Sequence, residues 1–353
     1  MTTAETANET ASETARLTVT RINAGLESSL VPMIGQILRI IRDISGKSER
    51  MSVGDLVEFI NGEPTIMARI VSIASSVGYN SSGAEINSVH HAISLIGFDR
   101  VRTLAISILL LESANSEHTA KANRELAGTA LIGGLAAAEM CRRKVSADPE
   151  LAFICGALRN YGRMLAATFL AREYAEMLKT PSRTGADETF RLTFGLTPLE
   201  LGQHIMTSLK LPKTILNTLV SLPSEERRHC SSNASNAVLG AADFGLRFAE
   251  ALQGPESDVS SFEHRIELLS NEYDVDFYLS RGDIRELLES LTGVLDSFRQ
   301  RAGTYVGTVA MFRRLENLTH KRALPAVLAP IVEPAVPAPK SIPPVQTDVS
   351  YDI

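Results

Sequence analysis

Hydrophobic residues recur every three to four positions along most of the chain, which is the spacing of one buried face of an α-helix. In residues 32–44 the apolar positions form a single stripe: Ile34, Ile37, Leu38, Ile41 and Ile44. No segment shows the sustained alternation of apolar and polar positions that is typical of a half-buried strand. The pattern therefore predicts an all-α protein.

Residues that begin and end helices divide this pattern into short elements. Ser52 predicts a helix start and Gly62 its end, and Pro64 suits the first turn of the next helix. Ser88 predicts another N-cap, and Gly97 the end of that helix. We therefore expect a compact unit of short helices that extends to about residue 115.

Longer helices follow in a second unit. Asp148 with Pro149 predicts the start of one helix over residues 148–170, and Thr197 with Glu200 predicts a capping box. The expected organisation is two packed helical subdomains plus C-terminal helices. In full, we expect a disordered tail at 1–18, subdomains at 19–115 and 116–252, a helical extension at 253–322, and a Pro/Ala-rich tail or linker at 323–353.

Composition narrows the class of protein. The net charge of −6 argues against non-specific binding of nucleic acid, which needs a basic surface. The three cysteines, Cys141, Cys155 and Cys230, are too few and too far apart for a disulfide framework or a zinc motif. No apolar run approaches the roughly 20 residues of a membrane span, and the N-terminus does not resemble a signal peptide. We expect a cytoplasmic protein.

Three segments follow one another in the N-terminal part: LVPMIGQILRIIRDI, EPTIMARIVSIASSVGY and INSVHHAISLIGFDRVRTL. Their order resembles the HDOD family, a non-catalytic branch of the HD phosphohydrolase superfamily in bacterial signalling. The resemblance covers roughly residues 28–250. Ser75 stands where the family usually has asparagine. The resemblance implies an HD-like helical bundle and a regulatory role.

The segment AFICGALRNYGRML resembles the helix that carries the His-Asp metal-binding pair of HD hydrolases. Arg159 and Asn160 occupy those two positions here. By the same comparison, the upstream histidine falls near Glu125 and the last aspartate is kept as Asp243. The downstream histidine positions fall near Pro198 and at 222–223.

These replacements predict a pseudo-enzyme without a metal or another cofactor. Arginine is cationic and has no free lone pair, so it cannot ligate a metal ion. We expect Arg159 to replace the metal charge by pairing with Asp243, and with Glu125 as a further candidate. The alternative is that Arg159 extends to the surface from a helix edge.

The sequence gives little support for other anion-binding, metal-binding or nucleophilic sites. Arg100 and Arg102 lie near a helix start and, with Arg159, are candidate anion-binding residues, although a solvated helix face is the simpler interpretation. The adjacent His90 and His91 point in different directions on a helix, which disfavours a shared metal. No G-x-S-x-G nucleophile motif or H-E-x-x-H zinc motif occurs.

Three functions stay open at this point. The first is a regulatory scaffold that binds another signalling protein. The second is a sensor that holds a nucleotide or cyclic dinucleotide in the old hydrolase pocket without metal, with Arg159 as the phosphate anchor. The third, disfavoured by Arg159 and Asn160, is a metal-dependent phosphohydrolase.

Overall fold

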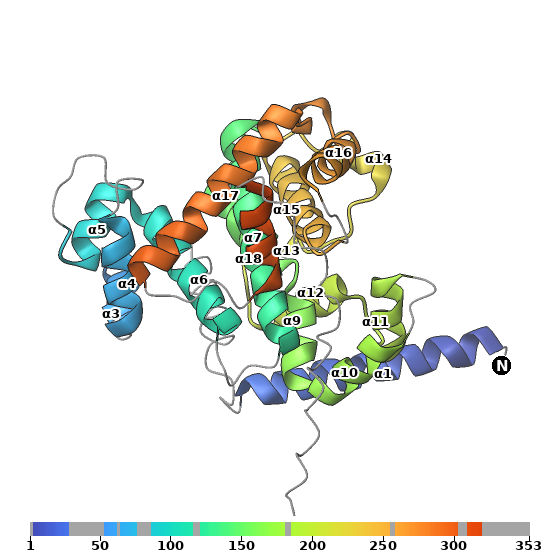
Figure 1. Ribbon diagram of the computed structural model, residues 1–353. Coiled ribbons are helices and arrows are strands. Elements are labelled where there is room, and N and C mark those ends of the chain that lie inside the picture. The colour runs from blue at the N-terminus through green and yellow to red at the C-terminus, as the bar shows by residue number, and fades with distance from the viewer. Residues whose placement is uncertain are drawn as a thin grey trace, which may run out of the picture.

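The computed structural model describes residues 3–27, 53–61, 64–75, 86–115, 121–180, 185–254, 258–302 and 309–319. These residues form helices joined by turns, with no strand among them, so the predicted all-α class is confirmed (Figure 1). None of the described helices is long and apolar enough to cross a membrane. The predicted Ile34–Ile44 stripe, the helix ends at Ser52 and Gly62, and the predicted tail at 323–353 lie outside the described residues.

Three helices form the centre of the molecule. They are α7 (Lys121–Arg143), α8 (Pro149–Leu158) and α15 (Ala234–Ala251), and each packs against the other two. Their facing sides carry small residues, so the backbones of α7 and α15 approach closely where Gly133 meets Gly245. A methyl group at Gly245 would overlap the carbonyl oxygen of Gly133. This close approach fixes the position of α15 relative to α7 and α8.

The N-terminal unit consists of α3 (Val53–Asn61), α4 (Pro64–Ala74), α5 (Val89–Ile96) and α6 (Phe98–Asn115). Two predicted helix ends are confirmed here. The Ser88 side chain accepts a hydrogen bond from the backbone N–H of His91 at 3.1 Å, and Gly97 ends α5 with a φ of +92°, where a side chain would be strained. α6 carries the apolar core of this unit onto α7.

The expectation of a disordered tail over residues 1–18 is wrong for the described residues, because Thr3–Glu27 forms helix α1. α1 packs along α9, α11 and α12, beneath the body in Figure 1. Ile22 is fully buried, and Gly25 leaves space that the ring of Phe169 fills. Residues 1–18 offer almost nothing to bury, which suggested disorder, but the small residues Ala11 and Ala15 allow α1 to lie close to Gly195. Residues 19–27 therefore pack with the second unit rather than with the first.

The remaining helices of the second unit surround the central three. They are α9 (Tyr161–Phe169), α10 (Ala171–Lys179), α11 (Ala186–Phe194), α12 (Pro198–Ser208), α13 (Lys213–Leu216) and α14 (Ser224–Arg227). The predicted capping box of α12 is confirmed: Thr197 accepts from the backbone N–H of Glu200, and Glu200 accepts from that of Thr197. Stacked and edge-on rings of Tyr174, Phe190 and Phe194 hold α10 against α11.

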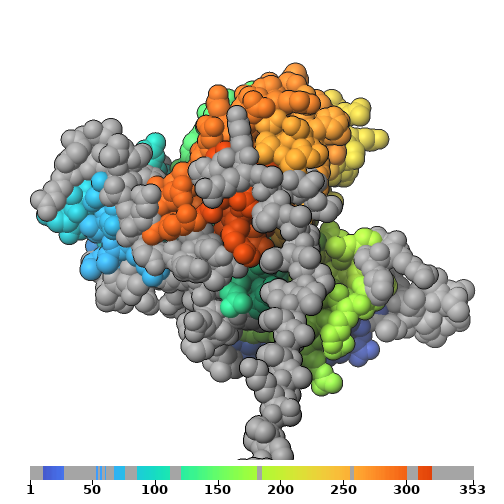
Figure 2. All heavy atoms as spheres, in the orientation of Figure 1, coloured from blue at the N-terminus to red at the C-terminus, as the bar shows by residue number. Residues whose placement is uncertain are grey.

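The C-terminal helices join the two units. They comprise α16 (Val259–Ser270), the short helix η1 (Val275–Phe277), α17 (Arg281–Ala302) and α18 (Ala310–Thr319). α17 packs against α4, α7, α16 and α18. In the space-filling view its orange surface runs from the N-terminal lobe toward the α15–α16 end of the molecule (Figure 2). The described helices of the 253–322 segment are thus integral to the packing.

The Gly133–Gly245 approach leads to a prediction about stability. Gly245→Ala places a methyl group against the backbone of α7, and we expect a loss of about 1–3 kcal/mol in the free energy of unfolding. Gly293→Ala in α17 is the control, because its methyl group meets no atom within 4 Å and improves helix propensity. Denaturant unfolding measures both variants. Equal stability of the two would contradict this packing.

Candidate functional site

The segment with the two unexpected polar residues is a junction between helices. α8 ends at Leu158 and α9 begins at Tyr161, so the prediction of one helix over 148–170 is wrong. Asn160 has φ −90° and ψ −2°, and its amide donates to the carbonyl of Leu126 at 2.7 Å. The redirected α9 lies close to α12, where a methyl group at Gly162 would overlap the Pro198 carbonyl. The turn thus holds Arg159 and Asn160 inside the protein.

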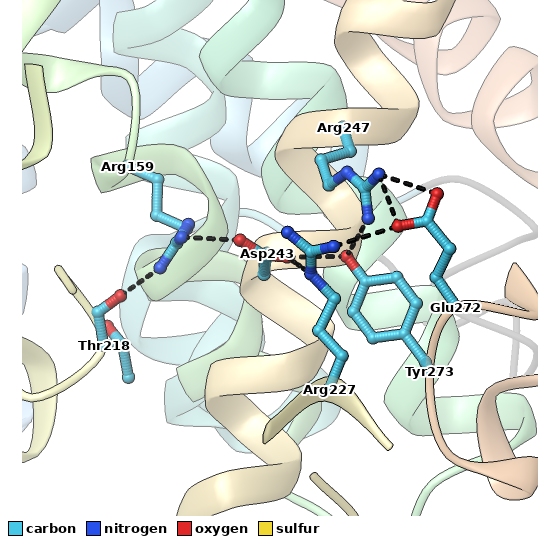
Figure 3. A network of polar contacts seen from close by, with 7 residues as sticks. All are labelled: Arg159, Thr218, Arg227, Asp243, Arg247, Glu272 and Tyr273. Carbon is cyan, nitrogen blue, oxygen red and sulfur yellow. Dashed lines mark hydrogen bonds and ion pairs between the residues drawn. The ribbon is translucent and has the colours of Figure 1, made fainter. Parts of the chain in front are cut away.

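Arg159 forms a buried ion pair from this junction. Its Nη2 donates to Oδ1 of Asp243 on α15 at 2.7 Å, and Nη1 donates to the backbone carbonyl of Thr218 (Figure 3). The two side chains are only 1% and 8% exposed. The predicted pairing of Arg159 with Asp243 is present, and the alternative of an arginine extended to the surface is wrong. Its Nε makes no hydrogen bond within the described residues.

The second oxygen of Asp243 is also occupied. Tyr273, which follows α16, donates its hydroxyl to Oδ2 at 2.6 Å. The Nε of Arg227 lies 3.3 Å from the same oxygen, close enough for an ion pair. Asp243 is therefore enclosed by two cations and one hydroxyl, which compensate the cost of burying its charge.

Further ion pairs and cation–π contacts lie between these groups and the protein surface. Glu272 pairs with Arg227 at 2.9 Å and with Arg247 at 2.8 Å, and both guanidinium groups lie 5.8 Å from the centre of the Tyr273 ring (Figure 3). Burial and the adjacent Asp243 carboxylate raise the pKa of Tyr273, so its hydroxyl stays protonated and donates. Sequence reasoning missed Arg227, Arg247, Glu272 and Tyr273, because no motif or spacing links them to residue 159.

Glu125 does not join this network. Its carboxylate accepts a hydrogen bond from the backbone N–H of Ala310 at 3.2 Å, at the start of α18. Within the described residues Arg159 makes its ion pair with Asp243 and none with Glu125. The expectation that Glu125 also pairs with Arg159 is therefore wrong: the unpaired N–H groups at the start of α18 attract this carboxylate.

Comparisons with known proteins identify the fold. The model of the HDOD domain family matches residues 31–221, slightly more than half of the chain. The chain belongs to the HDOD domain family. No curated protein matches the chain.

Two solved structures share the HDOD fold. One is an HDOD domain protein of unknown function from Geobacter sulfurreducens, with a TM-score of 0.54 and 15% identity over 82% of this chain and 99% of that one. The other, from Shewanella amazonensis SB2B, is assigned only provisionally as a phosphohydrolase, with a TM-score of 0.50 and 16% identity over 84% of this chain and 98% of that one. At these identities the likeness shows the fold alone.

The residues at this place in the HDOD fold do not fit a divalent metal ion. Arg159 brings a positive charge, and both oxygens of Asp243 are already engaged. Pro198 and Leu222, at the expected positions of downstream ligands, are buried residues without donor side chains. The described part of the chain holds no group of three or more His, Cys, Asp or Glu residues that could bind a metal.

The three candidate anion-binding arginines do not form one site. Arg102 pairs with Asp99 at 3.1 Å, and Arg159 is enclosed. Arg100 is exposed and lines a cavity between α6, α7 and α17 whose wall includes neither of the other two. Of these three arginines, Arg100 is the one that lines a cavity and makes no ion pair within the described residues.

The pair with Asp243 leads to a stability prediction. Arg159→Met leaves a carboxylate buried with fewer partners, and we expect a loss of about 3 kcal/mol in the free energy of unfolding. Arg21→Met is the matched control at the exposed pair with Glu173, where the loss should stay below about 1 kcal/mol. Denaturant unfolding of both variants measures the two losses in the free energy of unfolding. Similar losses in the two would mean that burial adds nothing to the Arg159 pair.

The cysteines lead to a second prediction. Burial raises the pKa of Cys155 and Cys141 to about 12 and that of Cys230 to about 11, so none supplies a thiolate near neutral pH. We expect the folded protein to react with a thiol reagent such as dithionitrobenzoate at pH 8 only as fast as it unfolds. The unfolded chain is the control. Rapid reaction of Cys155 in the folded protein would instead indicate a nucleophile.

Proposed function

We propose that this HDOD protein is a non-catalytic signalling scaffold that acts by binding another protein. The observation that carries the proposal is the buried ion pair between Arg159 and Asp243. It places a guanidinium where the resemblance to HD hydrolases predicts a metal ligand, and it uses the retained aspartate for structure. Membership in the HDOD family supports the regulatory part of the proposal.

The same pair weighs against a nucleotide sensor that uses Arg159. The guanidinium is closed off from solvent, and two of its nitrogens already donate to Asp243 and to the Thr218 carbonyl. A phosphate would have to displace a carboxylate from a charge-assisted hydrogen bond inside the protein. That exchange would also leave Asp243 with one cation fewer.

The absence of hydrolysis is tested directly. We expect the purified protein, supplied with Mn²⁺ or Mg²⁺, to bind no stoichiometric metal and to cleave neither phosphodiesters nor nucleotides. A known HD phosphodiesterase under the same conditions is the positive control. Turnover that requires metal and is lost in Arg159→Ala, while the variant stays folded, would contradict the proposal.

Partner binding needs a separate experiment. Leu95 on α5 is 41% exposed and lies in the N-terminal unit, whereas Leu192 on α11 is 74% exposed in the second unit. We expect Leu95→Glu to remove a specific protein captured from the native cell by the wild type, and Leu192→Glu to retain it. The captured protein is then purified and titrated against all three forms. Equal affinity for all three would exclude the surface around Leu95 as the binding site.

A further inference from the structure

A cavity of about 400 Å³ lies between three helices. Its walls come from α6, α7 and α17, with Glu150 of α8 at one end. On each helix the lining residues recur at three- and four-residue spacing, so each helix presents one face to the cavity. These residues are Arg100, Thr103, Leu104 and Ser107 on α6, Leu135, Glu139 and Arg142 on α7, and Ser290, Gly293, Val294, Ser297 and Phe298 on α17. The volume lies in the range of about 300–1,000 Å³ that is usual for small-molecule sites.

Most polar groups at one end of this cavity form ion pairs or hydrogen bonds with one another. Arg142 lies 2.9 Å from Glu139 and 2.9 Å from Glu150, and Thr103 donates to Glu150. These contacts compensate the charge of Arg142 and those of both glutamates, and Glu139 also pairs with Arg143 at 2.9 Å. Arg142 is therefore already engaged and is not the cation offered to a ligand.

Three polar side chains that line the cavity, those of Arg100, Ser107 and Ser290, have no partner in the described part of the chain. Arg100 is exposed and makes no ion pair there. Ser107 is only 1% exposed, and its hydroxyl makes no hydrogen bond although it lines the cavity. This hydroxyl is not fully buried, so it is available to a ligand atom or a water molecule in the cavity.

The apolar wall and the open rim complete the site. Leu104, Leu135 and Phe298 are buried side chains that line the cavity. Gly293 lies within the 22-residue helix α17, and a methyl group there would meet no atom within 4 Å. Glycine inside a helix costs about 1 kcal/mol relative to alanine, and nothing in the packing of the described residues requires it. Its small size keeps the mouth of the cavity open.

We infer that this cavity binds a small amphipathic organic monoanion. The apolar body would lie against Leu104, Leu135 and Phe298, and the acidic group would pair with Arg100 while Ser107 hydrogen-bonds to the ligand. Arg100 is the one lining cation without an ion pair in the described residues, and it matches a single negative charge rather than a polyphosphate. A hydroxyl at this depth is reached by a small molecule more readily than by the surface of a partner protein. The site is separate from the Arg159–Asp243 pair.

Anilinonaphthalene sulfonate is a suitable probe, because it joins an aromatic body to one negative charge and fluoresces when bound to apolar surface. We expect saturable one-to-one binding to the full chain and a rise in Tm with probe concentration, which excludes binding to unfolded protein. Gly293→Leu fills the cavity mouth without overlapping the backbone and should weaken binding at least about tenfold. Gly282→Leu on the same helix, outside the cavity, should leave it unchanged.

Two further variants test the polar contacts. Arg100→Gln should weaken binding of the sulfonate about 2- to 5-fold and leave binding of the uncharged phenylnaphthylamine unchanged. Ser107→Ala should weaken it about 2- to 10-fold. Circular dichroism confirms that each variant is folded.

Several outcomes would overturn the inference. They are no saturable binding, equal binding by Gly293→Leu and Gly282→Leu, or equal effects of Arg100→Gln on the charged and the uncharged probe. If Gly293→Leu removes the captured partner protein and leaves probe binding intact, the cavity is a protein-docking surface and the inference fails. These results leave the test of catalysis unaffected, because it concerns a different place in the fold.

Discussion

The burial of one carboxylate, that of Asp243, organises the polar interior of this protein. A carboxylate that is 8% exposed must be compensated by charge and hydrogen bonds. Its partners come from three separate segments: Arg159 from the α8–α9 junction, Arg227 from α14, and Tyr273 after α16. Arg159 also donates to the backbone carbonyl of Thr218. The α8–α9 turn and the segment after α16 are therefore held by the same charge.

This arrangement links the C-terminal helices to the HDOD core. The family match ends at residue 221, so Arg159 lies within it, whereas Asp243, Arg227, Glu272 and Tyr273 lie beyond it. α17 then returns across α7 to α4, and its small residues leave a cavity open beside α6. The extension thus contributes both to the buried ion pair and to the proposed ligand site.

The sequence was sufficient for the helical class and for several helix ends. Ser88, Gly97 and Thr197 act locally, through their own backbone or side chain, so their roles can be predicted from short stretches. The pairing of Arg159 with Asp243 could be predicted only through the family resemblance, because 84 positions separate the two residues. Arg227 and Tyr273 could not be predicted, since their roles depend on tertiary packing. α1 was missed because residues 1–18 offer few apolar side chains to bury, and its packing against α9, α11 and α12 cannot be read from the sequence.

The central claim is that Arg159 and its ion pair occupy the place of the metal site. The most direct measurement is an anomalous diffraction map from crystals grown with excess Mn²⁺. We predict no anomalous peak near Asp243, and a guanidinium that remains within hydrogen-bond distance of its carboxylate. A manganese peak at ligand distance from Asp243, with the Arg159 side chain displaced, would contradict the account.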